Sequence, residues 1–147
     1  MANPNLPQGT INRLQASIVW HDFPGLNITP SFLAPEGIDM TLEGTMTTML
    51  PTMTGVVTSP EPWMMMRMVV HLIRAQPLAT AYKTQWELSS LIGEGTVRPD
   101  VISSVLPPFE VSNVAITNLN TLNYSGRDAG FVITLMGSYN VNSALWP

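Results

Sequence analysis

The sequence predicts a mainly β chain, either a β-sandwich or a partly closed antiparallel barrel with one α-helix packed on it. Three observations lead to this class. Several stretches alternate apolar and polar residues with the period of two that strands require, and only one segment has a helical period. The chain has 147 residues, the length of one ordinary domain with its own hydrophobic core. We therefore expect a single domain over residues 1–147, with long strands or hairpins that extend from it.

Residues 63–74 give the clearest strand pattern. The even-numbered positions from Met64 to Leu72 are all apolar, whereas the odd-numbered positions include Arg67 and His71. On a helical wheel these two polar residues share a side with methionines, and the adjacent valines also favour a strand. We expect one face of this strand to lie in the core and the other to meet water or a partner.

Residues 38–50 repeat this pattern with a sharper contrast between the faces. Apolar side chains from Ile38 to Leu50 alternate with acidic and hydroxyl side chains from Asp39 to Thr47. Such alternation predicts a strand with one buried and one polar face. The following residues, 51–62, include three prolines and a glycine, so we expect a long loop or the end of an extended hairpin there.

One segment, which begins at Pro77, has a helical period. Its apolar residues, which continue to Ile92, fall on one side of the wheel, and Lys83 and Glu87 fall on the other. Proline suits a first helical turn, and Gly93 suits a helix end. We expect an amphipathic helix that lies across the sheet, with a weak i, i+4 pair between the lysine and the glutamate.

The remaining strands are expected near the two ends of the chain. Residues 109–124 and 131–142 both have strand character, and the SGRDAG segment between them supplies turn residues. This combination predicts a hairpin. Near the N-terminus, residues 14–23 and 26–32 predict two further short strands.

The chain carries few charges. Charged residues make up 11% of it, against about 25% in typical soluble proteins, and hydrophobic residues make up 45%. A subunit that buries several faces against copies of itself accounts for this composition better than a lone monomer does. The net charge of −4 and the scattered positions of the six basic residues argue against a protein that grips nucleic acid.

No motif in the sequence indicates a catalytic, cofactor or metal site. There is no cysteine, which excludes disulfides and a cysteine nucleophile. His21 and His71 are the only histidines, and Ser103 lies outside any nucleophile elbow. We therefore expect no cofactor and no enzymatic activity. The polar N-terminal stretch and the absence of a long apolar run predict neither a secretory leader nor a membrane anchor.

Three stretches resemble the tail tube proteins of contractile-tailed, myovirus-type bacteriophages. They are LPTMTGVVTSPEPWMMMRMVVHLIRAQPLATAYKTQ, the GEGTVRPD element and YSGRDAGFVITLMGSYNVNSALW. Together they cover about residues 50–100 and 124–146. The order of loop, long strand, helix and closing hairpin is similar as well.

This resemblance implies a structural virion protein of the phage tail, assembled in the host cytoplasm. Such subunits form hexameric rings whose strands extend into a continuous inner β-barrel, and the rings stack into a helical tube, the conduit for DNA ejection. The implied partners are further copies of the chain, the tail sheath protein, and baseplate and tail-terminator proteins. The tape measure protein and DNA would pass through the lumen without specific binding. The Pro-rich segment 51–62 and both termini would contact the next ring or the sheath.

Within that resemblance, the strands at 38–50 and 63–74 are the candidates for the lumen wall. Their apolar faces would pack under the helix, and hydroxyl groups with some negative charge would line the bore and repel DNA phosphates. If the two strands pair simply, the basic side chains of the second would lie on the same side and neutralise carboxylates of the first. The lumen-facing candidates are Asp39, Thr41, Glu43, Thr45, Thr47, Arg67 and His71.

Two alternatives remain open at this level. The first is another ring-forming tail component, such as a tail-end or baseplate adaptor, which would form one ring instead of a stack. The second is a carbohydrate-binding β-sandwich module that recognises sugars through one or more of its tryptophans, Trp20, Trp63, Trp86 and Trp146.

Overall fold

A computed structural model describes residues 5–6, 16–98, 107–122 and 125–146 of the chain. Three features considered in the sequence lie outside these residues: most of the polar N-terminal stretch, Ser103, and the end of the strand-like segment at 123–124.

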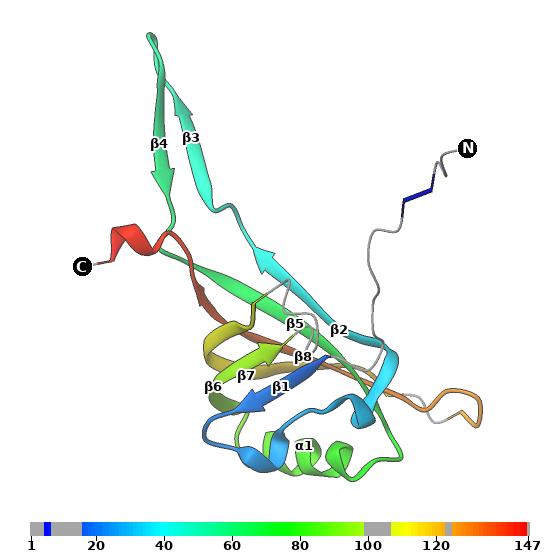
Figure 1. The fold of residues 1–147 in the computed structure, drawn as a ribbon. Coiled ribbons are helices and arrows are strands. Elements are labelled where there is room, and N and C mark those ends of the chain that lie inside the picture. Colours follow the sequence, from blue (N-terminus) through cyan, green and yellow to red (C-terminus); the bar gives the residue numbers. More distant parts are fainter. Residues whose placement is uncertain (1–4, 7–15, 99–106, 123–124, 147) are drawn as a thin grey trace.

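Within the described residues the fold is mainly β, with six antiparallel strands that curl into a half-barrel and one α-helix that packs against its concave side (Figure 1). This confirms the predicted partly closed barrel with a single packed helix. The order of strands in the sheet is β1-β6-β7-β8-β5-β2. The elements are β1 (Ser17–Trp20), β2 (Leu33–Glu43), β3 (Thr47–Pro51), β4 (Val56–Pro60), β5 (Trp63–Ile73), α1 (Pro77–Leu88), β6 (Leu91–Arg98), β7 (Phe109–Leu122) and β8 (Gly130–Asn140).

The methionine-rich strand is β5, which pairs with β2 on one side and with β8 on the other. Its even-numbered side chains are buried from Met64 to Leu72, and its odd-numbered side chains are exposed or half-buried. Methionine suits this position because its flexible side chain fills irregular space between a curved sheet and a helix. The predicted division into a core face and a second face is confirmed.

The C-terminal hairpin is also confirmed, since β7 and β8 pair in antiparallel fashion around the turn that contains SGRDAG. Its core-facing side chains include Phe131, Ile133 and Leu135, which are all buried. The pairing of β7 with β8 contains three register shifts, one of which leaves Asn113 with a positive φ of 55°.

The helix is shorter than the sequence predicts. It ends at Leu88, and Ile92 belongs to strand β6. Gly93, which was expected to end the helix, instead has a φ of +99° at a shift in the pairing of β6 with β7. The apolar positions after Leu88 fit the helical period only by coincidence, because pairing with a neighbouring strand decides their conformation. The predicted Lys83–Glu87 pair forms, with 2.7 Å between Nζ and Oε1.

The predicted strand at 26–32 is wrong. Two 3-10 turns, Pro24–Leu26 and Pro30–Phe32, occupy this region, and each begins at a proline. Proline fixes φ near the helical value and lacks the N–H that a sheet ladder needs. Only Ile28 between them joins the sheet, through two backbone hydrogen bonds to Ile18, each of 2.9 Å.

The long strand predicted at 38–50 is divided in two. Gly44, with a φ of +95°, separates β2 from β3, and β3 pairs with β4 in a separate two-stranded ribbon. This ribbon projects away from the half-barrel as an extension of β2 and β5 (Figure 1). The segment 51–62 is therefore the end of an extended hairpin, which was one of the two expectations for it.

Candidate functional site

The outer face of the sheet is the surface that lies opposite the core. The register sets its composition, because residues paired across antiparallel strands point to the same side. Thr41 pairs with Arg67, which in turn pairs with Met136. Polar side chains dominate this surface on β2, and hydroxyl and apolar side chains alternate on β8. It comprises Asp39, Thr41 and Glu43 of β2, Met65, Arg67, Val69 and His71 of β5, and Val132, Thr134, Met136 and Ser138 of β8.

One ion pair and one side-chain hydrogen bond join β2 to β5 on this outer face. Arg67 Nε lies 3.2 Å from Glu43 Oε1, and His71 Nε2 lies 3.2 Å from Asp39 Oδ2. The residue alternation predicts that the basic side chains of β5 lie on the same side as the carboxylates of β2 and close to them, and the observed distances agree. Because the arginine and both carboxylates are more than a third exposed, each pair contributes about 0–1 kcal/mol to folding. The main effect of the Arg67–Glu43 pair is to cancel one negative charge of the surface.

Thr45 and Thr47 do not belong to the outer face. Thr45 lies in the connector after β2, and Thr47 is the first residue of β3 in the projecting hairpin. The break at Gly44 removes both from the sheet, so the set of candidate residues on the outer face reduces to the five on β2 and β5.

The outer face also contains a polar hollow of about 380 Å³ beside Arg67. Thr134 Oγ1 lies 2.6 Å from Asn120 Oδ1 and donates to it, and Thr117 Oγ1 donates to the carbonyl oxygen of Thr134 over 3.2 Å. No local pattern of residues groups Asn120 with Arg67. Only the strand order, which places β8 between β5 and β7, brings them together.

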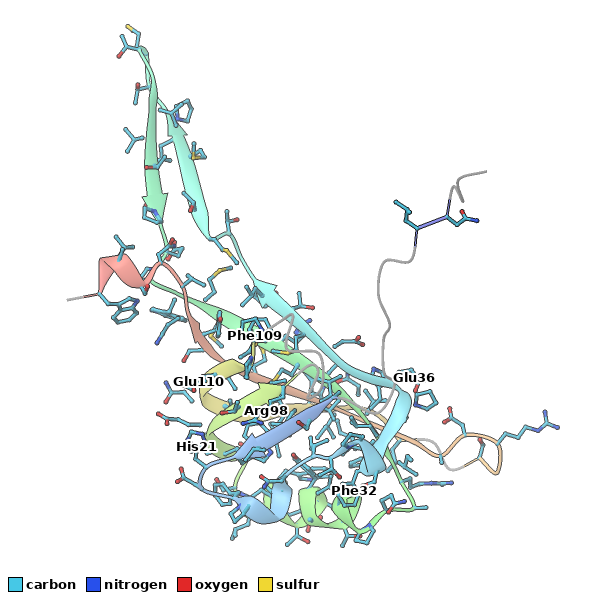
Figure 2. All side chains as sticks on the ribbon, viewed as in Figure 1. His21, Phe32, Glu36, Arg98, Phe109 and Glu110 are labelled. Atoms are coloured by element: carbon cyan, nitrogen blue, oxygen red, sulfur yellow. The ribbon has the colours of Figure 1, made fainter. Side chains whose placement is uncertain are left out.

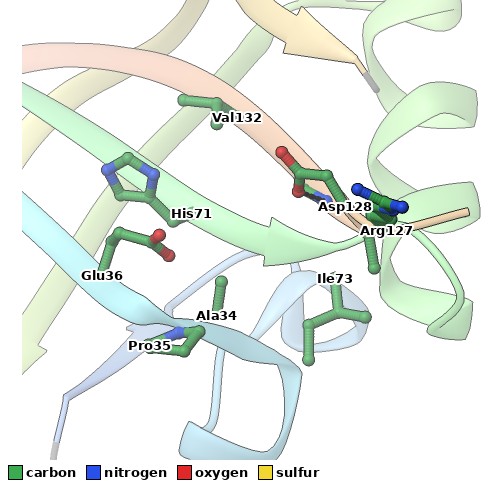
Figure 3. Close-up of a pocket in the computed structure, with 10 residues that line it drawn as sticks. Ala34, Pro35, Glu36, His71, Ile73, Arg127, Asp128 and Val132 are labelled. Carbon is green, nitrogen blue, oxygen red and sulfur yellow. Dashed lines mark hydrogen bonds between the residues drawn. The ribbon is translucent and has the colours of Figure 1, made fainter. Parts of the chain in front are cut away.

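A second pocket, of about 360 Å³, lies at the end of the sheet farthest from the hairpin (Figure 3). Residues 34–37 of β2 bulge opposite His71 alone, because Leu33 pairs with Leu72 and Ile38 pairs with Val70. The bulge places Glu36 beside the histidine, and the turn before β8 adds Arg127 and Asp128.

Two strand edges are open among the described residues. The outer edge of β2 has no partner strand. The pairing of β6 with β7 ends at Ala115, so residues 117–122 of β7 have a neighbouring strand only on the β8 side. The edge of β1 differs, because Ile28 covers it through its two hydrogen bonds with Ile18. Open edges are sites where another chain can pair.

The hairpin of β3 and β4 exposes apolar side chains on both faces (Figure 2). No other described segment packs on it, and a two-stranded ribbon without such support is only marginally stable in water. Met53 at its tip is fully exposed. Concentrated apolar surface of this kind marks an interaction site. The exposed apolar residues of the hairpin and its connector are Met46, Met49, Leu50, Met53, Val56 and Val57.

The four tryptophans have different environments. Trp20 is buried, and half-buried Trp86 stacks on Phe131 with 5.9 Å between ring centroids. Trp63 and Trp146 are both about half exposed and line one groove of about 370 Å³ at the base of the hairpin. The groove also includes Met65, Asn113, Ser138 and Asn140.

Within the part of the chain that the structure describes, no three His, Asp or Glu side chains are grouped so as to hold a metal ion. Nor does any helix there have the length and apolar character needed to cross a membrane. Comparison with protein families and with curated proteins finds no match for this chain.

Proposed function

We propose that this chain is a structural virion protein, the inner tube subunit of a contractile bacteriophage tail. Copies of it would form hexameric rings that stack into the conduit for DNA ejection, and it would have no enzymatic role. The proposal rests on the structure of the curved sheet. Its apolar face packs against the helix, its outer face has little net charge, and its edges at β2 and β7 are open among the described residues. Such a sheet suits a wall that neighbouring copies continue.

The outer face has the chemistry that a DNA conduit needs. Among the described residues that β2, β5 and β8 contribute to this face, the one arginine, Arg67, is paired with Glu43, and His71 lies beside Asp39, so this part of the face offers phosphate no unpaired arginine or lysine. Affinity for a DNA backbone depends on clustered cations that release counterions, and a surface without them lets the duplex pass. Exposed hydroxyl and amide groups, such as those of Thr41 and Asn120, keep the surface hydrated.

The projecting hairpin supports stacking in the proposed tube. Its exposed apolar side chains would be buried by contact with an adjacent ring, which consists of further copies of the same chain. Ring contacts close on themselves, whereas head-to-tail stacking contacts repeat without limit, so one subunit needs two separate surfaces. The sheath, baseplate and tail-terminator proteins are the other proposed partners, on the outside and at the ends of the tube.

Electron microscopy of the purified protein tests the proposal directly. Long hollow tubes of constant diameter with six-fold averaged end views are the expected result. Discrete rings that never stack would favour the alternative of a single-ring tail component such as a baseplate adaptor. A solution of monomers at high concentration would contradict both.

A carbohydrate-binding module is the second candidate, and the groove between Trp63 and Trp146 is the observation that favours it. Aromatic rings offer flat apolar surfaces, and the amides of Asn113 and Asn140 are suitable partners for sugar hydroxyl groups. Trp20 is excluded from this role because it is buried. A glycan array separates the two functions: binding that is lost in Trp63→Ala and retained in Trp86→Phe would favour the lectin-like role.

A further inference from the structure

The open edge of β7 adjoins a groove of about 370 Å³ on the helix side of the sheet, in which Trp86, Ile116 and Leu119 are the apolar lining residues and Ser90, Thr117 and Asn118 the polar ones. Trp86 of α1 forms one wall of this groove, and residues 116–119 of β7 form the other. At the same edge the backbone N–H of Leu119 donates to the side-chain oxygen of its neighbour Asn118 over 2.8 Å. An incoming strand would offer carbonyl oxygens in place of this local bond.

Open strand β2 has the pattern that this edge would accept. Its side chains at Ile38, Met40 and Leu42 are apolar, point to the helix side and are only partly buried. The side chains of Asp39 and Thr41 point to the outer face. A strand beside β7 with this alternation would place its apolar side chains in the groove and its polar ones on the outer face.

Strand direction also matches. The pairs β7–β8, β8–β5 and β5–β2 are all antiparallel, so β2 runs opposite to β7 within one chain. A rotation about an axis near the strand direction preserves that relation between copies. The β2 of one copy would therefore meet the β7 of the next as an antiparallel neighbour, the more stable arrangement per residue.

We propose that β2 of one copy pairs with residues 117–122 of β7 in a second copy and inserts its apolar side chains into the groove lined by Trp86. This contact rests on the proposed ring and specifies how the ring closes. It makes β7, β8, β5 and β2 the four strands that each copy contributes to a continuous wall, and it leaves the hairpin free for other contacts.

Disulfide trapping tests this contact cleanly because the chain has no cysteine of its own. One set of copies carries Thr41→Cys on β2, and another carries Asn118→Cys or Asn120→Cys on β7. A disulfide forms only when the two Cα atoms lie about 4.4–6.8 Å apart. After mixed assembly and oxidation, we expect a mixed dimer on a non-reducing gel, with at least ten-fold more of it than in mixtures of Thr41→Cys with Thr84→Cys on the helix.

The same samples are viewed by electron microscopy, so that two kinds of failure are distinguishable. Rings or tubes without the mixed disulfide, or with disulfides only between two Thr41→Cys copies, would overturn the β2–β7 contact and leave the tube proposal intact. Absence of any ring or tube would overturn both.

A charge placed on either side of β2 gives a second measurement. We expect Met40→Glu, which directs a carboxylate into the groove, to reduce assembly at least ten-fold, whereas the adjacent Thr41→Glu retains it. Thermal unfolding of both variants as monomers checks that each remains folded. Equal assembly by the two folded variants would contradict the insertion of β2 side chains into the groove.

Discussion

Trp20 and Tyr82 form a buried hydrogen bond between the first strand of the sheet and the helix. Trp20 Nε1 donates to the Tyr82 hydroxyl over 3.0 Å, and that hydroxyl donates to the carbonyl oxygen of Leu26 over 2.8 Å. All three residues are at least 95% buried. One phenol group thus joins β1, α1 and the turn after β1, and it holds the helix in place under the sheet.

Replacement of Tyr82 by phenylalanine should destabilise the domain. The change leaves the indole N–H of Trp20 and the carbonyl of Leu26 without their buried partner, which costs about 1–3 kcal/mol. Urea denaturation followed by tryptophan fluorescence measures the loss. Tyr139→Phe, at a half-buried ring that packs on Phe109, is the matched control and should cost less. An equal effect of the two variants would contradict the role of the phenol.

Alkaline pH should weaken the fold through the same tyrosine. Burial raises the pKa of Tyr82 well above its usual value, against a smaller lowering by the hydrogen bond from Trp20. The folded state therefore holds this proton more tightly than the unfolded state does. Its contribution is complete below the unfolded pKa of about 10, and it falls by about 1.4 kcal/mol per pH unit above that value. The free energy of unfolding, measured from pH 9 to 11.5, should decrease more steeply in the wild type than in Tyr82→Phe.

An added methyl group at Gly95 should disturb the core. A Cβ at this position would lie 2.4 Å and 2.6 Å from two ring carbons of Trp20, far inside contact distance. We expect Gly95→Ala to lower the free energy of unfolding by about 1–3 kcal/mol, the usual effect of overpacking. Gly126→Ala is the control, since nothing lies within 4 Å of its added Cβ. A melting temperature that falls equally in both variants would refute the steric explanation.

Reversal of charge on the outer face should slow DNA passage without loss of assembly. The double variant Asp39→Lys, Glu43→Lys replaces both carboxylates that pair with His71 and Arg67 by cations. Phosphates would then be held at the wall. Micrographs should show normal tubes, and particles that carry the variant should deliver their genome more slowly than particles with Asp39→Asn, Glu43→Gln. Delivery at the wild-type rate would mean that this face does not line the lumen.

A charge at the hairpin tip should block stacking and leave the monomer unchanged. Met53 is fully exposed in one chain, so Met53→Asp should change the free energy of unfolding by no more than about 0.5 kcal/mol. In the proposed tube the same position is covered by another copy, and a buried unpaired carboxylate opposes that contact. Sedimentation should show rings or monomers in place of tubes. Thr80→Asp, on the exposed side of α1, should still form tubes.

The local sequence pattern was sufficient to predict strands β5 and β8 and to assign the two faces of β2. In each of these strands, an apolar residue stands at nearly every second position, and burial of one face requires that period of two. The pattern failed after Leu88 and at 26–32. Ile92 satisfied a helical period but lies in a strand, and two prolines in the N-terminal segment start 3-10 turns. In both places, contacts with distant residues or the geometry of proline outweighed periodicity.

The outer-face candidates were predictable in part for the same reason. Their spacing alone places Asp39 and Glu43 on one face of β2, and it places Arg67 and His71 on one face of β5. Direct pairing of the two strands then puts all four side chains on the same side of the sheet. Spacing gave no sign that Gly44 would turn Thr45 and Thr47 out of the sheet. Spacing also could not predict that Asn120 lies near Arg67, because strand β8 separates the strands that carry them.

The sequence by itself determined a low-charge, mainly β chain with a methionine-rich core strand and one amphipathic helix, because composition and periodicity are properties of neighbouring residues. Only the tertiary structure decided the strand order, the projection of the hairpin, and the open edges at β2 and β7. These depend on pairings between segments up to about eighty residues apart, such as Ser17 with Arg98 and Trp63 with Asn140. Side-chain packing across the whole core selects such pairings, and no local pattern encodes them.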